Sequence, residues 1–229
     1  MAKTAAVLAC AGTGSRMKGT CDDKLLFDRL GIPVAAHTLK AYDATEEIDF
    51  IVIVTQKSLV SVYEKFKKDF GIKKRIKVVV GGDSRMESVL NGVRAVPECY
   101  EYVAIGDGAR PLIRPQEIQA TVRAAVETGA AALGLFLTDT IKEVKDGRIL
   151  KTLPRDTLVG IQTPQVFRRE EYLQLAEQAI KTGQNFTDDA SIYEYFGRPV
   201  TLVEGRRDNI KITLPEDIAI FLALMEEQQ

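Results

Sequence analysis

Two glycines and two cations follow a short apolar stretch, residues 5–9, near the start of the chain. Gly12 and Gly14 let the backbone turn sharply and approach a ligand closely, with N–H groups free to point at an anion. Arg16 and Lys24 add positive charge within a dozen residues of the first glycine, which favours phosphate groups. The combination predicts a loop that binds a triphosphate, and the alternative is a surface turn with solvated basic side chains.

Neither of two well-known phosphate-binding loops matches this stretch. The Walker A loop requires Gly-Lys followed by Ser or Thr, a combination that the chain does not contain. The dinucleotide-binding fingerprint requires a third glycine where Met17 stands, and an acidic residue where the second strand ends in Thr55 and Gln56. A phosphate-binding loop here therefore belongs to another class.

Two further polar clusters follow predicted strands. Gly106 and Gly108 flank Asp107 and leave room for a ligand, so that Asp107 could hold Mg²⁺ or a sugar hydroxyl, or cap a turn. Asp83 and Ser84 could cap a helix or form a small polar pocket that reads the edge of a base. In open α/β sheets, ligands gather beyond the carboxyl ends of the strands. We therefore expect these clusters to lie near the first loop.

A cation also stands in an unusual position near the end of the chain. Lys211 lies between Ile210 and Ile212, where its side chain could serve a buried site or extend to solvent. Just after it, Thr213 and Glu216 have the spacing of a capping box, which predicts the start of the last helix.

Apolar strands and amphipathic helices alternate along the chain and must position these residues. This alternation predicts an α/β fold with a mostly parallel sheet. Ser84 and Glu87 form the expected capping box of the third helix. The expected strands are 5–9, 50–54, 77–80, 102–105, 130–137 and 200–204, and the expected helices are 33–44, 59–70, 85–96, 115–128, 170–181, 188–195 and one from 215 onward.

The alternation stops after residue 137. Two short segments, 140–144 and 148–153, are joined by Asp146 and Gly147, a dipeptide typical of a hairpin turn. We expect one domain over 1–229, in which 138–160 form a projecting β-arm. An arm whose apolar face has no local core often packs on a second subunit, so the sequence predicts a homodimer.

The composition excludes several classes of function. Among 229 residues, 31 basic and 32 acidic side chains nearly cancel, so neither nucleic acid nor a membrane surface is an expected partner. His37 is the one histidine, which argues against a histidine-based triad or metal cluster. The three cysteines are odd in number and have no framework spacing, and we see no signal or membrane-spanning segment. A cytoplasmic protein is expected.

Taken together, the chain resembles the 2-C-methyl-D-erythritol 4-phosphate cytidylyltransferases of non-mevalonate isoprenoid biosynthesis. The resemblance implies a Rossmann-like nucleotidyltransferase fold with a mixed, mostly parallel sheet and an arm that forms a homodimer. The matching stretches are A-G-T-G-S-R-M (11–17), G-G-D-S-R-M-E-S-V (81–89), D-G-A-R-P (107–111), D-T-I-K (139–142), Q-T-P-Q-V-F (162–167), T-D-D-A-S (187–191) and E-G-R-R-D-N-I-K-I-T (204–213).

The resemblance also implies a reaction, in which CTP and 2-C-methyl-D-erythritol 4-phosphate give CDP-methylerythritol and pyrophosphate. Arg16, Lys24 and Lys211 are then the catalytic cations, and Mg²⁺ enters mainly through the CTP phosphates, with Asp107 as its candidate protein ligand. The implied nucleotide-binding residues are Ala11, Gly12, Gly14, Gly82, Asp83, Ser88 and Asp107, of which Gly82, Asp83 and Ser88 read cytosine. The implied acceptor-binding residues are Asp107, Arg110, Thr140, Arg155, Thr163, Thr187, Asp208 and Lys211, with Thr140 and Arg155 supplied by the partner's arm.

Three departures from the family pattern stand out. The family usually has P-A-A-G where residues 8–12 read L-A-C-A-G, and H-D-A-A-R-P where residues 106–111 read G-D-G-A-R-P. It usually has proline before the loop lysine, where this chain has Asp23. From the first two we expect altered kinetics rather than a new reaction. Asp22 and Asp23 beside Lys24 should weaken phosphate attraction unless Mg²⁺ or closure of the loop offsets it.

Three alternative functions, two enzymatic and one non-enzymatic, are considered beside this one. Ribitol-5-phosphate cytidylyltransferase has the same CTP chemistry with a linear acceptor, and a sugar-1-phosphate nucleotidyltransferase would use another NTP. The non-enzyme alternative is a catalytically silent nucleotide-binding module, but it would require an essential cation to be missing. Arg16, Lys24 and Lys211 are all present.

Overall fold

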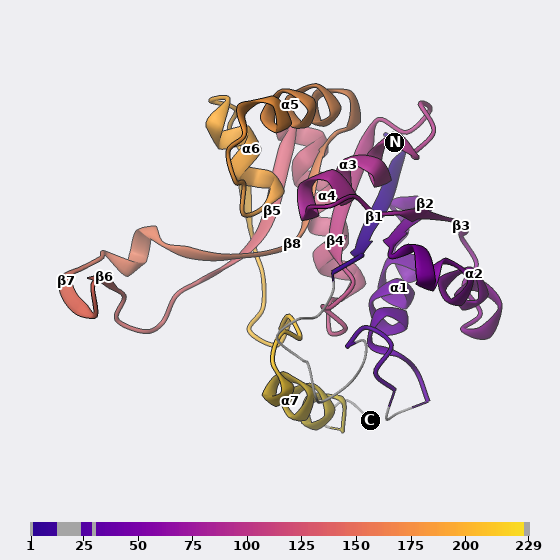
Figure 1. Ribbon diagram of the computed structural model, residues 1–229, viewed down its shortest axis with the longest axis horizontal. Coiled ribbons are helices and arrows are strands. Elements are labelled where there is room, and N and C mark those ends of the chain that lie inside the picture. Colours follow the sequence, from indigo (N-terminus) through magenta and orange to yellow (C-terminus); the bar gives the residue numbers. More distant parts are fainter. Residues whose placement is uncertain (1, 13–23, 29–30, 227–229) are drawn as a thin grey trace.

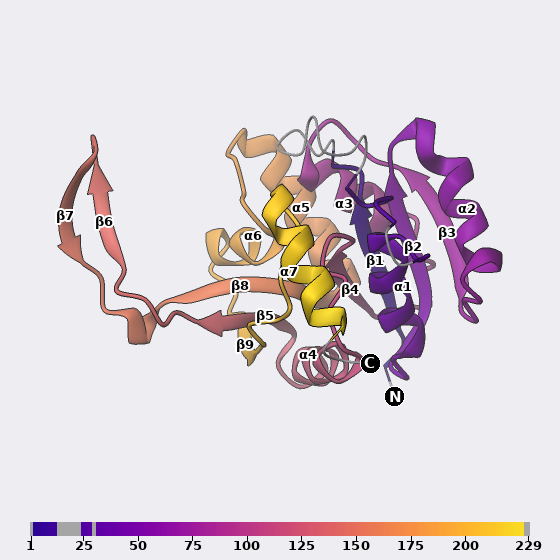
Figure 2. The ribbon, with the colours of Figure 1, turned by 90° about the horizontal axis from the view of Figure 1, so that it is seen from below.

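The computed structural model describes residues 2–12, 24–28 and 31–226, and its centre is a seven-stranded sheet (Figures 1 and 2). Strand β8 is antiparallel to both of its neighbours, β4 and β5, whereas the other pairs in this sheet are parallel. The predicted α/β fold with a mostly parallel mixed sheet is therefore confirmed. In spatial order the strands are β3 (Arg75–Val80), β2 (Ile48–Thr55), β1 (Thr4–Cys10), β4 (Tyr102–Asp107), β8 (Val159–Arg168), β5 (Ala130–Phe136) and β9 (Thr201–Glu204).

Helices cover both faces of the sheet, and each layer of helices shares a hydrophobic core with it. Successive side chains of a strand point to opposite faces, so in β1 Leu8 belongs to one core and Val7 to the other. The first core includes α1 (Val34–Ala44), α2 (Val60–Asp69), α4 (Pro115–Thr128) and α7 (Pro215–Glu226). The second includes α3 (Arg85–Arg94), α5 (Arg169–Thr182) and α6 (Asp189–Tyr195). Short 3₁₀ helices span Lys57–Leu59 and Arg155–Thr157.

Most predicted elements are present, and the exceptions have local causes. Strand β8 is missing from the sequence-based prediction because Gln162, Pro164 and Gln165 interrupt its apolar pattern. The capping box of α3 is confirmed. The predicted Thr213–Glu216 box is wrong, because it is the Asp217 carboxylate that accepts from the backbone N–H of Thr213, at 2.7 Å.

A separate hairpin follows β5 and projects from the layered body (Figure 1). It consists of β6 (Lys142–Lys145) and β7 (Arg148–Thr152), which pair antiparallel. The turn residues Asp146 and Gly147 have φ values of 49° and 74°, the left-handed conformation that an Asp-Gly hairpin turn requires. Ile149 in this hairpin is 67% exposed although its side chain is apolar.

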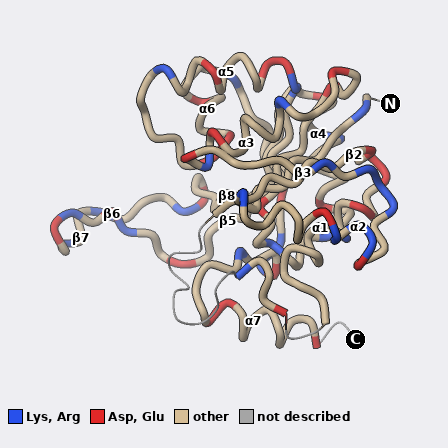
Figure 3. The backbone as a smooth tube through the Cα atoms, turned by 45° about the vertical axis from the view of Figure 1, so that its right-hand side comes forward, with Lys and Arg blue, Asp and Glu red and all other residues tan. Residues whose placement is uncertain are grey.

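The surface carries mixed charge. Lys and Arg are interspersed with Asp and Glu along the backbone, including the arm (Figure 3), and the formal net charge is −1. No helix in the described part of the chain is long and apolar enough to cross a membrane.

Candidate active site

Two adjoining cavities open near the carboxyl ends of the parallel strands. The first has a volume of about 410 Å³ and is lined by residues that follow β1, β3 and β4. Parallel strands end at the same edge of a sheet, so clusters that are far apart in the sequence lie together here. The predicted residues in its lining are Ala11, Gly12, Lys24, Gly82, Asp83, Ser88, Asp107 and Lys211.

The second cavity has a volume of about 480 Å³ and lies toward β8 and the start of α6. Arg85, Asp107 and Lys211 line both cavities, so they mark the boundary between them. A group bound in one cavity can therefore meet a group bound in the other at these three side chains. The predicted residues in its lining are Asp107, Arg110, Thr163, Thr187 and Lys211.

Asp107 is the buried anion at the centre of this boundary. Lys211 Nζ lies 2.7 Å from its Oδ2, and Arg85 Nη2 lies 3.7 Å from its Oδ1. Burial by itself would raise the pKa of Asp107, but the charges of Lys211, Arg85 and Arg110 outweigh it and hold the pKa below its ordinary value. Asp107 is therefore a carboxylate at neutral pH, surrounded by cations.

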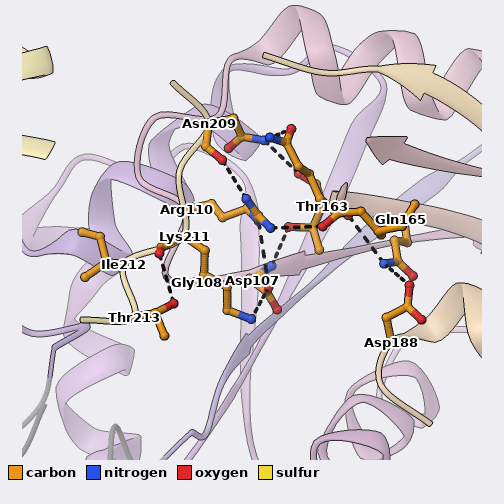
Figure 4. A network of polar contacts seen from close by, with 12 residues as sticks. Asp107, Gly108, Arg110, Thr163, Gln165, Asp188, Asn209, Lys211, Ile212 and Thr213 are labelled. Carbon is orange, nitrogen blue, oxygen red and sulfur yellow. Dashed lines mark hydrogen bonds and ion pairs between the residues drawn. The ribbon is translucent and has the colours of Figure 1, made fainter. Parts of the chain in front are cut away.

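Thr163 reaches the site because β8 runs antiparallel to β4. Gln165 of β8 pairs with Ile105 of β4 in register, so Thr163 lies beside the carboxyl end of β4. The backbone N–H of Asp107 donates a hydrogen bond to Thr163 Oγ1 at 3.0 Å (Figure 4). The Thr163 hydroxyl thus supports Asp107 and can still donate its own hydrogen to a ligand.

Arg110 is a buried cation in the wall of the second cavity. Its Nη1 donates to the carbonyl oxygen of Asn209 at 2.7 Å (Figure 4). The Asn209 side chain donates to Gln162 Oε1 at 3.1 Å. Burial lowers the pKa of Arg110 although Asp107 raises it. Arginine still remains protonated in proteins, so this guanidinium is a permanent charge at the cavity.

A tight turn after β3 forms another wall of the first cavity. The backbone N–H of Gly82 donates to Ser88 Oγ at 3.0 Å, and that hydroxyl lies 3.3 Å from the Gly82 carbonyl oxygen. A Cβ atom at Gly82 would lie 2.5 Å from Glu87 Cβ, so glycine is needed for this close approach. The turn leaves backbone polar groups and the Asp83 side chain beside the cavity.

The two lysines come from opposite ends of the chain and meet at one segment. Lys24 Nζ donates to the carbonyl oxygen of Ile212 at 2.7 Å, and the backbone N–H of Ile212 donates to the Ala109 carbonyl at 2.8 Å. Ile212 directly follows Lys211. Lys24, Lys211 and the end of β4 are thereby held at the first cavity.

Two departures from the family pattern lie in contact. By the resemblance described above, Cys10 and Gly108 each stand where alanine is expected. A Cβ atom at position 108 would lie 2.4 Å from Cys10 Sγ. The larger residue at 10 and the smaller one at 108 therefore compensate for each other in volume. Gly108 directly follows Asp107, so this close packing lies at the candidate site.

We expect Gly108→Ala to destabilise the protein by about 1–3 kcal/mol, the usual cost of overpacking a core. In a Cys10→Ala background the same substitution should cost much less, because the nearest remaining contact is Ala9 O at 3.4 Å, an ordinary separation. Urea unfolding of the wild type, both single variants and the double variant gives the coupling energy, expected at roughly 0.5–3 kcal/mol. Strict additivity would contradict the volume exchange.

Some predicted site residues do not line either cavity of this chain. Within this one chain, Thr140 and Arg155 belong to the arm and line neither cavity; Arg155 Nη1 donates to the Thr138 carbonyl at 2.8 Å. Asp208 also lies outside both linings, and its carboxylate pairs with Arg206 at 2.6 Å and with Arg114 at 3.4 Å. Gly14, Arg16, Asp22 and Asp23 lie outside the described residues.

Two residues at the site, Arg85 and Gln165, have no role predicted from the sequence. Arg85 lies in a quoted family stretch and directly follows the Ser84 cap, so its place at the start of a helix after β3 could have drawn attention. Gln165 Oε1 accepts from the Ala190 N–H at 2.8 Å and its Nε2 donates to Asp188 at 3.0 Å. No local pattern signals that contact, because it depends on the unpredicted strand β8.

Comparison with known proteins gives a consistent result. A family model described as 2-C-methyl-D-erythritol 4-phosphate cytidylyltransferase matches residues 4–227. A protein of that name from Pelotomaculum thermopropionicum is 40% identical over 231 residues, covering 100% of this chain and 97% of the relative. One from Desulforamulus reducens is 39% identical over 230 residues, covering 100% and 98%. The solved 4-diphosphocytidyl-2C-methyl-D-erythritol synthase of Anaerococcus prevotii has a TM-score of 0.87 at 28% identity, covering 98% of this chain and 96% of that one.

Proposed function

Because this chain belongs to the 2-C-methyl-D-erythritol 4-phosphate cytidylyltransferase family, we propose that its two cavities bind the two substrates of that reaction. The enzyme converts CTP and 2-C-methyl-D-erythritol 4-phosphate to CDP-methylerythritol and pyrophosphate, a step of non-mevalonate isoprenoid biosynthesis. The observation that carries the proposal is the boundary at Arg85, Asp107 and Lys211, which line both cavities. A transfer between two bound substrates needs such a shared boundary.

CTP occupies the first cavity in this proposal. The turn at Gly82, Asp83 and Ser88 reads cytosine by its polar edge, and Lys24 and Lys211 hold the phosphates. Arg16 joins these two cations, and Ala11, Gly12 and Gly14 allow the backbone to approach the nucleotide. Local positive charge supports this assignment because the triphosphate is strongly anionic. The roles of Arg16 and Gly14 rest on the family resemblance.

The polyol phosphate occupies the second cavity, where Arg110, Thr163 and Thr187 contact it. Its phosphate is the nucleophile and is largely ionised at neutral pH, because its second pKa is about 6. An oxygen of this phosphate forms a bond to the α-phosphorus of CTP as the bond to pyrophosphate breaks. No general base is required, and the one histidine, His37, packs against Phe221 with ring centroids 5.4 Å apart.

The protein must then align the two phosphates and neutralise the negative charge that grows between them. Lys24 and Lys211 supply fixed positive charge at the first cavity. Asp107 keeps Lys211 at the boundary through their 2.7 Å ion pair. Such preorganised charge costs no reorganisation during the reaction.

Mg²⁺ is the proposed cofactor. Within the described ranges, no three His, Cys, Asp or Glu side chains gather in a metal-binding cluster. Mg²⁺ usually binds one or two carboxylates together with substrate phosphates, so a single carboxylate, Asp107, beside the phosphates fits such an ion. When bound, Mg²⁺ neutralises phosphate charge and helps to orient the groups.

The proposal is tested by pyrophosphate release with CTP and Mg²⁺, using methylerythritol phosphate and ribitol 5-phosphate in parallel. We expect strong preference for methylerythritol phosphate. Preference for ribitol 5-phosphate would keep the CTP assignment and overturn the acceptor assignment. The absence of pyrophosphate release with both acceptors would contradict the proposed roles of the cavities.

We further propose that residues 1–229 form one nucleotidyltransferase domain and that 138–160 form a dimerisation arm. Exposed apolar side chains at Val144, Ile149 and Leu150 support an interface there. In the dimer, Thr140 and Arg155 of each arm contact the acceptor in the partner's second cavity, with Asp208 as a further acceptor contact. The proposed location is the cytoplasm, supported by an odd number of cysteines.

A size measurement checks the arm. Light scattering should give about twice the chain mass of 25.3 kDa, because the exposed arm has no core of its own to cover its apolar side chains. Replacing Ile149 and Leu150 with Ser should shift the protein toward the monomer. A monomeric wild type would contradict the placement of Thr140 and Arg155 in a neighbouring site.

A further inference from the structure

Arg85 lines both cavities, yet the roles proposed above do not explain why a second cation stands beside Lys211 at their boundary. It is the first residue of α3, directly after the Ser84 cap. Its Nη2 donates to Asp189 Oδ2 at 2.8 Å and lies 3.7 Å from Asp107 Oδ1. The Arg85 side chain is held by Asp189 and is still 33% exposed, so a ligand in the cavities can reach it.

A buried carboxylate anchors Arg85. Asp189 is 1% exposed, and its second oxygen, Oδ1, accepts a hydrogen bond from the Tyr172 hydroxyl at 2.7 Å. Tyr172 is fully buried. Burial opposes the charge on Arg85, but Asp189 and Asp107 outweigh that effect and raise the pKa of Arg85. The guanidinium is therefore permanently charged, and its orientation is fixed by the buried Asp189 carboxylate.

Arg85 has further donors available at the boundary between the cavities. Among the described residues, Nη2 makes the one side-chain hydrogen bond of Arg85, so Nε and Nη1 can still donate. Arginine presents its donors in a planar fork that matches two oxygens of a phosphate. Lys211, the other cation of the boundary, offers one charge and is already 2.7 Å from Asp107.

The nucleophilic phosphate must approach the α-phosphorus of CTP to about 3–3.5 Å before reaction. It must therefore lie at the boundary and close to the Asp107 carboxylate, which repels it. We propose, on the basis of the function assigned above, that Arg85 contacts the phosphate of the polyol substrate and offsets this repulsion. Asp189, held by Tyr172, acts as a positioning residue that aims Arg85.

The test compares KM for methylerythritol phosphate and KM for CTP in Arg85→Gln, Arg85→Lys and Asp189→Asn. Arg85→Gln should raise KM for the polyol phosphate roughly ten- to hundredfold, the usual effect of losing a charged hydrogen bond. KM for CTP should stay within about twofold. Arg85→Lys should have a KM for the polyol phosphate between those of the wild type and Arg85→Gln, because lysine keeps the charge and loses the planar fork of donors. Asp189→Asn should raise the same KM by a smaller factor.

Arg94→Gln is the matched control. Arg94 is also on α3 and pairs with a helix carboxylate, Glu177, at 2.8 Å, but it lines neither cavity. It should match the wild type in both KM values. If Arg85→Gln behaves like this control, or raises KM for CTP instead, the proposal is overturned. If Asp189→Asn fails to fold by circular dichroism, Tyr172→Phe tests the positioning role through the same shift in KM.

Calorimetric titration of the polyol phosphate without CTP separates this inference from the proposed function. Weaker binding by Arg85→Gln than by the wild type supports the Arg85 contact even if no pyrophosphate is released. Equal binding by the two proteins overturns it even if the wild type is active.

Discussion

Replacing Lys211 with Ala is expected to reduce kcat/KM by roughly a hundredfold to a thousandfold, the typical loss for one preorganised group that stabilises transition-state charge. Lys211 lines both cavities and lies 2.7 Å from Asp107, so it can serve both phosphates. Pyrophosphate release under single-turnover conditions measures the effect on the chemical step. Wild-type turnover in this variant would contradict its catalytic role.

The same variant should be more sensitive to acid. Burial favours the neutral form of Asp107, while Lys211 is the largest of the opposing charges that lower its pKa. A lowered native pKa gives stability that is present above the unfolded-state pKa and is lost as the pH falls through the native value. Without Lys211 the native pKa rises, so acid unfolding should begin at a higher pH than in the wild type. Lys65→Ala, on the exposed surface of α2, is the control and should leave both measurements unchanged.

Replacing Lys24 with Ala is expected to reduce kcat/KM by roughly a hundredfold or more. Lys24 lines the first cavity, where we propose that CTP binds, and it donates a hydrogen bond to the Ile212 carbonyl at 2.7 Å. Because it lines the first cavity and not the second, KM for CTP should change more than KM for the polyol phosphate. Steady-state kinetics with each substrate varied in turn will check this difference.

Asp22→Asn and Asp23→Asn provide a matched test of the loop before Lys24. Their charges should weaken phosphate attraction, so each variant is expected to lower KM for CTP by a small factor. The shift should shrink at high salt, because screening weakens charge interactions. A raised KM for CTP would instead indicate that these acids help the loop to bind.

The sequence was sufficient to predict elements whose information is local. The apolar strand at residues 50–54, the helix that starts at Pro115 and the Asp-Gly hairpin turn are all present, because periodicity and turn conformation depend on neighbouring residues. Strand β8 is the counterexample. Its place in the sheet comes from pairing with β4 and β5 on either side. Gln162 and Gln165 interrupt its apolar pattern, so local periodicity does not predict the strand.

The candidate site likewise contains residues that the sequence predicts and residues that only the structure reveals. Gly82, Asp107 and Lys211 were identified because short stretches around them resemble those of one family, and the three indeed line one cavity. Arg85 lay inside such a stretch without a role, because its meaning depends on Asp189, which is 104 positions away in the chain. Pairing between distant residues leaves no periodic trace in the sequence.

By itself, the sequence determined the fold class and the family, and it supplied the set of cations and glycines that we propose for the chemistry. The tertiary structure alone decided that Asp107 is a buried carboxylate between cations, that Thr163 lies beside it, and that a Cβ atom at position 108 would meet Cys10 Sγ. The physical reason is that residue types and local periodicity depend only on residues that are neighbours in the sequence. Burial, charge compensation and packing arise when strands distant in sequence pair across the sheet.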